Sequence, residues 1–153
     1  MISRNDELAR QLARVYWLMH RRFDRAMTEQ GASLARTRLL LFVANGGGLA
    51  RAADIAEIFG QAPRTVTQGL DAAERDGLIE RVPDAVDRRV KRLRITDSGR
   101  KVIEASEPLR RALVQDVFGV LDDDERIALE AIFGKLAAQL PIEGNLFRSD
   151  KDS

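Results

Sequence analysis

Apolar residues recur at steps of three and four through the first thirty positions, which is the spacing of one face of an α-helix. This pattern predicts a long helix over residues 5–30 that ends at Gly31. Similar patterns predict five further helices, over residues 34–44, 52–59, 63–76, 98–119 and 122–140. Between the fourth and fifth helices, residues 78–82 and 90–95 have the composition of strands and flank a turn. The chain is therefore predicted to be mainly α-helical with one β-hairpin.

Residues with strong preferences for helix ends support these boundaries. Ser33 is placed to cap the second helix. Pro63 suits the first turn of the fourth helix, where a missing N–H removes no hydrogen bond. Asp122 followed three residues later by Glu125 is the pattern of a capping box. Pro108 is expected to bend or interrupt the fifth helix.

The order of these elements predicts a winged helix-turn-helix fold. Two short helices joined by a tight turn form a helix-turn-helix, and the hairpin that follows has the position of a wing. The flanking helices have larger apolar faces than so small a core needs, which indicates dimerisation. We therefore divide the chain into an N-terminal dimerisation helix, a winged DNA-binding region, C-terminal dimerisation helices and a polar tail, over residues 1–32, 33–97, 98–142 and 143–153.

Composition limits the chemistry. The chain has 153 residues, no cysteine and one histidine, His20. Disulfides, cysteine-ligated zinc, thiol switches and histidine-rich metal sites are therefore excluded, and we expect neither a metal nor a cofactor. No apolar run reaches the ~20 residues of a membrane span. The charged N-terminus lacks the apolar region of a signal peptide, so we expect a cytoplasmic protein without a membrane partner.

The sequence carries no pattern typical of an enzyme. It has no nucleophile elbow, phosphate-binding loop or dinucleotide fingerprint. The glycine run at residues 46–48 lacks the Lys-Ser/Thr that a phosphate-binding loop requires, so we interpret it as a flexible connector. We therefore predict no catalytic residues and a function other than catalysis.

The near-neutral net charge of +1 conceals an uneven distribution of charge. Residues 1–38 carry eight arginines against four acids, whereas residues 104–153 carry six bases against eleven acids. Within the predicted hairpin, residues 84–94 carry five bases against two acids, and these bases are Arg88, Arg89, Lys91, Arg92 and Arg94. Such a local basic ribbon is either a solvated hairpin or the binding surface for an anionic partner.

The segment from Asp87 to Gly99 resembles the wing of the multiple antibiotic resistance regulator (MarR) family. That family pattern is Asp-x-Arg, a basic strand and then Leu/Ile-Thr-x-x-Gly, which this chain matches with Asp87-Arg88-Arg89 and Ile95-Thr96-Asp97-Ser98-Gly99. Upstream, residues 54–57, 65–67 and 71–79 resemble the two DNA-reading helices and the exit from the second. The resemblance covers roughly residues 6–140.

This resemblance implies a homodimeric, mostly helical transcriptional regulator, most often a repressor, that binds a pseudo-palindromic operator in double-stranded DNA. In that family the terminal helices dimerise, and a small aromatic or phenolic ligand commonly tunes the affinity for DNA. By position, Asp87 would orient the wing and Arg89 would enter the minor groove, with Arg88 as the competitor for that role. A carboxylate two residues from an arginine can also hold the guanidinium extended.

Further DNA-binding candidates lie at the start of the fourth helix and on the wing. They are Arg64, Thr65, Thr67, Gln68 and Lys91. Arginine suits guanine and glutamine suits adenine, whereas the two threonines are equally consistent with ordinary helix surface. Three positions depart from the family pattern, because Arg51 and Ala62 replace usual cap residues and Gly69 replaces a large apolar residue.

Polar aromatic residues gather on the first helix and suggest a site for the ligand. Tyr16, Trp17, His20 and Phe23 are candidates to line a pocket, with Arg38 or Arg21 as the partner of a carboxylate. The same residues are also consistent with packing at a dimer interface.

One other class of protein fits the order of elements. A winged-helix dimer can serve as a protein-interaction module without binding specific DNA. Such a module has no need for the row of bases on the hairpin, so the wing favours the DNA-binding interpretation.

Overall fold

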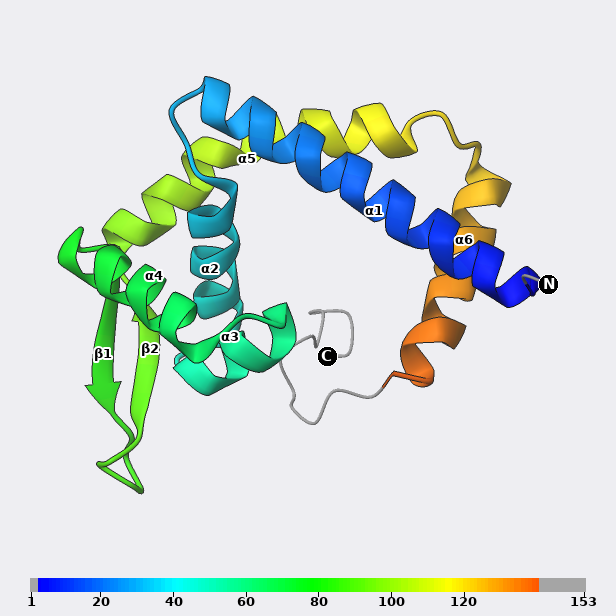
Figure 1. Cartoon of the computed structure of the whole chain (residues 1–153). Helices are drawn as coiled ribbons and strands as arrows, with labels where there is room; N and C mark the ends of the chain where they lie inside the picture. The colour runs from blue at the N-terminus through cyan, green and yellow to red at the C-terminus, as the bar shows by residue number, and fades with distance from the viewer. Residues whose placement is uncertain (1–2, 141–153) are drawn as a thin grey trace.

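The computed structural model describes residues 3–140 and confirms the predicted mainly helical winged fold (Figure 1). Its elements are α1 (Arg4–Glu29), α2 (Leu34–Asn45), α3 (Ala52–Phe59), α4 (Pro63–Arg75), β1 (Ile79–Pro83), β2 (Lys91–Ile95), α5 (Asp97–Phe118) and α6 (Asp123–Ala138). The predicted boundaries agree to within one or two residues. The polar tail predicted over residues 143–153 lies outside the described residues.

The helix ends show why the departures from the family pattern leave the fold intact. Ser33 caps α2 and Asp122 forms a capping box with Glu125, as predicted. Arg51 precedes α3, where the Asp54 carboxylate accepts a hydrogen bond from the Arg51 backbone N–H at 2.9 Å. α4 begins without a side-chain cap, with Pro63 in its first turn. Acids or proline in the first turn therefore replace the usual cap residues.

The hydrophobic core lies in the reading head, which consists of α2, α3, α4 and the hairpin. Leu40, Ile55, Leu70 and Leu93 come from four different elements and are 1% exposed or less. The packing explains why position 69 is a glycine where the family has a large apolar residue. A Cβ atom at Gly69 would lie only 3.3 Å from the Leu39 Cδ1 atom. The missing side chain therefore lets α4 pack closely against α2.

The hairpin is joined to the core in the middle of β2 and at its base. β1 and β2 pair antiparallel, with Ile79 opposite Ile95, and the Leu93 N–H donates to the Ala50 carbonyl in the α2–α3 connector at 2.8 Å. At the base, the Thr96 hydroxyl donates to the Gly77 carbonyl at 2.6 Å and caps α5 by accepting from the Gly99 N–H. This explains the Thr-x-x-Gly spacing in chemical terms.

α1, the second half of α5 and α6 form an arm that extends away from the reading head (Figure 1). Arg22 of α1 pairs with Asp116 of α5 at 2.6 Å. Pro108 does not interrupt α5, although the helix changes direction along its length (Figure 1).

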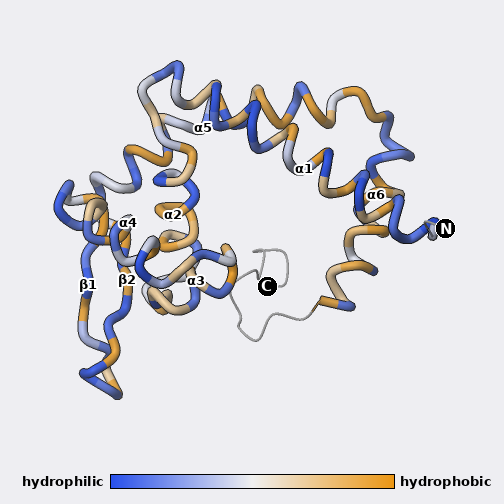
Figure 2. Tube along the Cα trace, viewed as in Figure 1, coloured by the Kyte–Doolittle hydropathy of each residue, from blue (hydrophilic) through white to orange (hydrophobic). Residues whose placement is uncertain are grey.

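Apolar residues recur along the helices of the arm (Figure 2), and many of them are exposed within one chain. The described part of α6 has no buried residue, and its Ile127 is 65% exposed. On α1, Leu8, Leu12 and Val15 are each more than half exposed, whereas Met27 on the same face is fully buried near the reading head. Among the helices in residues 3–140, none is long and apolar enough to cross a membrane.

Candidate DNA-binding surface

The exposed face of α4 presents Arg64 and Gln68 in the first half of the helix. Val66, Leu70 and Ala73 are buried, so the geometry of the helix places Arg64 and Gln68 on the opposite, exposed face. Arg64 makes no ion pair with any residue in the described range 3–140. These two residues are therefore available to contact a surface docked on the helix.

The two threonines predicted beside them lie on the flanks of that face. The Thr67 hydroxyl donates to the Pro63 carbonyl at 2.9 Å, so its proton is already in use within the helix. Thr65 is exposed, but it lines a cavity between α1, α2 and α4. The structure thus separates the four predicted α4 residues into a pair on this face and two flanking residues.

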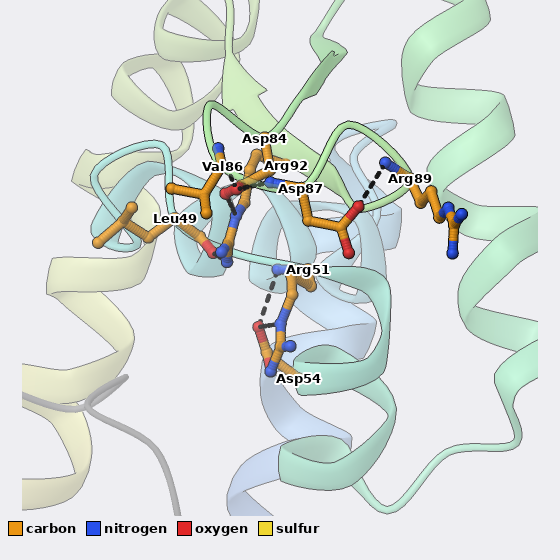
Figure 3. A network of polar contacts seen from close by, with 8 residues as sticks. All are labelled: Leu49, Arg51, Asp54, Asp84, Val86, Asp87, Arg89 and Arg92. Atoms are coloured by element: carbon orange, nitrogen blue, oxygen red, sulfur yellow. Dashed lines mark hydrogen bonds and ion pairs between the residues drawn. The ribbon is translucent and has the colours of Figure 1, made fainter.

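Asp84 organises the turn of the wing (Figure 3). Its Oδ1 atom accepts from the backbone N–H groups of Val86 and Asp87 at 2.9 and 3.0 Å, and its Oδ2 atom accepts from Arg92 Nε at 2.5 Å. The backbone N–H of Asp87, then the Arg92 side chain, lowers the pKa of the Asp84 carboxyl from 3.8 to about 2. The sequence interpretation counted Asp84 only as an acid and did not anticipate that its carboxylate holds the turn together.

The Asp87 carboxylate contacts the main chain of Arg89 rather than its side chain. Its Oδ1 atom accepts from the backbone N–H of Arg89 at 3.0 Å, and it makes no contact with the Arg89 guanidinium among the described residues (Figure 3). The idea that the carboxylate holds the guanidinium extended is therefore wrong, because the nearer donor is the main chain. Asp87 fixes the path of the backbone and leaves the guanidinium free.

The basic ribbon contains two kinds of residue. Within residues 3–140, Arg88, Arg89 and Lys91 are exposed and make no ion pair. Arg92 pairs with Asp84, and Arg94 lies 3.8 Å from the Glu80 carboxylate on the neighbouring strand. The free positive charge of the wing therefore comes from three residues rather than five.

Arg81 is a residue that the sequence interpretation missed. It lies on β1, and its guanidinium binds Asp71 at 2.7 Å and also Glu74, both on α4. Partial burial lowers the pKa of Arg81, but the hydrogen bonds to these two carboxylates outweigh it and leave the pKa raised. The sequence pattern that could have indicated this contact is two acids three residues apart on α4 followed by a base on the next strand. This clamp joins the hairpin to α4 and neutralises acids near the exposed face.

A cavity of about 460 Å³ lies between α1 and the reading head. Tyr16, His20 and Arg38 line it, as predicted for the ligand site, whereas Trp17 and Phe23 lie outside its lining. The Arg38 guanidinium carbon lies 5.0 Å from the centre of the Phe59 ring, which also lines the cavity. Thr65 and Gly69 place one face of α4 in its wall.

The helix-turn-helix and hairpin define a winged helix-turn-helix protein, and comparisons with known proteins identify its family. The profile of the MarR family matches residues 30–90. The chain is 31% identical to the HTH-type transcriptional repressor MdtR of Bacillus subtilis over 112 residues, which is 73% of this chain and 72% of MdtR. The chain therefore belongs to the MarR family of transcriptional regulators.

Two further matches agree with this assignment. An uncharacterised HTH-type transcriptional regulator of B. subtilis, YsmB, is 30% identical over 76 residues, which span half of this chain and only 52% of YsmB. The crystal structure of the S. aureus MepR–DNA complex is 25% identical and matches with a TM-score of 0.69, covering 86% of this chain and 96% of MepR.

Proposed function

We propose that this protein is a homodimeric repressor that binds a pseudo-palindromic operator through α4 and the wing. The observation that carries this proposal is the combination of Arg64 and Gln68 on the exposed face of α4 with three exposed cations on the adjoining wing. A recognition helix of this kind reads base edges in the major groove. Arg88 and Arg89 on the wing suit the minor groove, whose negative potential attracts guanidinium groups.

The uncovered apolar surface supports the dimer. A 16-residue helix with no buried residue gains almost no stability from packing in one chain. We propose that residues 1–32 and 98–142 form the interface and that residues 33–97 form the reading head. A second reading head also doubles the DNA that is read, which a single short recognition helix needs for specificity.

The cavity supports control by a small aromatic acid. Arg38 supplies a cation for the carboxylate, and Tyr16, His20 and Phe59 supply aromatic surface. Because α4 contributes to the wall, a ligand there would act on the position of the recognition helix. We propose that such a ligand releases the DNA.

Fluorescence anisotropy tests this function. The purified protein is titrated with DNA from upstream of its own gene and with scrambled DNA, at several salt concentrations. We expect binding to the upstream DNA to be ~10³-fold tighter, with an affinity that falls steeply as salt rises. If binding to both DNAs is weak and equal, the measurement is repeated with DNA selected from a random library. Weak binding to the selected DNA as well would overturn the proposal and favour the protein-interaction module.

The same complex tests the ligand. Benzoate and 4-hydroxybenzoate are added to the protein–DNA complex, and release is compared for wild type and Arg38→Gln. We expect release from the wild type and a weaker response from the variant, with unchanged affinity for DNA in the absence of ligand. If the wild type and Arg38→Gln release DNA at the same ligand concentration, the ligand does not act through this cavity.

A further inference from the structure

The wing is joined to the α2–α3 connector through one side chain. Arg92 donates from Nε to Asp84 Oδ2 at 2.5 Å and from Nη1 to the Leu49 carbonyl at 2.7 Å (Figure 3). The Arg92 and Asp84 side chains are only 26% and 15% exposed. Both charged groups are therefore held in place rather than freely solvated.

Asp84 connects this link to the tip of the wing. Its other oxygen binds the backbone N–H groups of Val86 and Asp87, and Asp87 in turn accepts from the Arg89 N–H. A continuous chain of hydrogen bonds therefore runs from the connector through Arg92, Asp84 and Asp87 to the backbone of Arg89. Charge-assisted hydrogen bonds of this kind are stronger than neutral ones.

We propose that Arg92 is a positioning residue that holds the wing turn in place for DNA binding without contacting DNA itself. This inference rests on the proposed function, since it assigns Arg92 a role in that same surface. The backbone bond from Leu93 to Ala50 already fixes the strand, so Arg92 is the group that carries this restraint out to the turn. A turn that is held in place loses less conformational entropy when it binds.

The neighbouring Arg94 provides a matched control. It lies two residues along the same strand, so it is on the same face of the hairpin, and its side chain is 59% exposed. Arg92→Gln and Arg94→Gln remove the same charge from nearly the same place. We expect Arg92→Gln to weaken operator binding about tenfold and Arg94→Gln only two- to threefold. Equal losses would mean that only the charge matters.

A second variant separates positioning from charge by the sign of its effect. Asp84→Asn makes the wing more positive, which by electrostatics alone should tighten binding to DNA. Loss of the ion pair with Arg92 should instead weaken operator binding, by several-fold. Tighter binding by Asp84→Asn would overturn the proposal.

A double-mutant cycle tests whether Arg92 acts through Arg89. If it does, Arg92→Gln should have little further effect in a protein that already carries Arg89→Ala. Additive losses would instead assign Arg92 its own contact with DNA and contradict the proposal.

Amide hydrogen exchange tests the link without DNA. Arg92→Gln should speed exchange at the Val86 and Asp87 N–H groups, whereas Arg94→Gln should not. Circular dichroism checks that both variants keep the fold. Unchanged exchange would overturn the positioning role even if operator binding is confirmed. If Arg92→Gln speeds exchange but the wild type binds no operator, the structural role of Arg92 is supported and the proposed function is rejected.

Discussion

The Asp87 carboxylate accepts a hydrogen bond from the backbone N–H of Arg89 at 3.0 Å, and this contact fixes the main chain while the arginine side chain stays free. The wing thus presents a guanidinium on a defined backbone with no internal partner among the described residues. A free cation on a constrained loop suits insertion into a narrow minor groove, because no ion pair has to break first.

Replacing Arg89 should therefore weaken operator binding without affecting the dimer. We expect Arg89→Ala to reduce the affinity about tenfold or more, measured by fluorescence anisotropy, with unchanged sedimentation. Arg14→Ala on α1 removes the same charge outside α4 and the wing and should change the affinity by less than about twofold. A comparable loss of affinity in both variants would show that binding depends on the net charge of the protein rather than on the position of Arg89 in the wing.

Gln68 should determine which bases are preferred. It lies on the exposed face of α4, where an amide can bind a base edge at two points. Gln68→Ala should lower the affinity for the best operator. It should also reduce the difference in affinity between that operator and its single-base variants. Thr67→Ala is the control, because that hydroxyl already donates to Pro63. If Gln68→Ala weakens binding to all sequences by the same factor, Gln68 contacts the phosphate backbone instead.

The dimer interface should depend on the uncovered stripe of α1. Leu12 is 52% exposed on the face that buries Met27 farther along the helix, so a charge there would be enclosed at the interface. We expect Leu12→Glu to raise the dimer dissociation constant at least about a hundredfold in sedimentation velocity.

The matched control for this prediction is Trp17→Glu. Trp17 is apolar and 67% exposed, but it lies about 140° around the helix from Leu12. It should therefore leave the dimer intact. Dissociation by both variants would place the interface on a broader surface of α1, and dissociation by neither would place it elsewhere on the arm.

The fold could be predicted from the sequence because its signals are local. Helical periodicity, Ser33, Pro63 and the capping box at Asp122 each act within a few residues, and each is found where it was expected. The resemblance to the family wing added the role expected of the hairpin. These two sources together gave the order and the boundaries of all the described elements.

The pairing of the charged side chains could not be predicted in the same way. Glu80 and Arg94 are 14 positions apart and meet because they are directly opposite in the hairpin register, which the sequence does not specify to the residue. Arg81 reaches back to α4, and Arg92 reaches a carbonyl 43 positions upstream. Counting bases along the strand therefore overestimated the free charge of the wing.

The lowered pKa of Asp84 gives the wing a defined response to acid. A carboxyl with a lower pKa in the folded than in the unfolded chain stabilises the fold fully above its unfolded value, near 3.8 for Asp84, and loses that contribution as the pH falls toward about 2. The wing turn should therefore be unchanged from neutral pH to about 4 and loosen between about 4 and 2.

Carboxyl carbon NMR should place the Asp84 midpoint near 2, with circular dichroism following global unfolding in parallel. In Arg92→Gln the midpoint should rise but stay below 3.8, because the Asp87 N–H, the largest single cause of the shift, is retained. A wild-type midpoint near 3.8 would mean that the carboxylate does not hold the turn in solution.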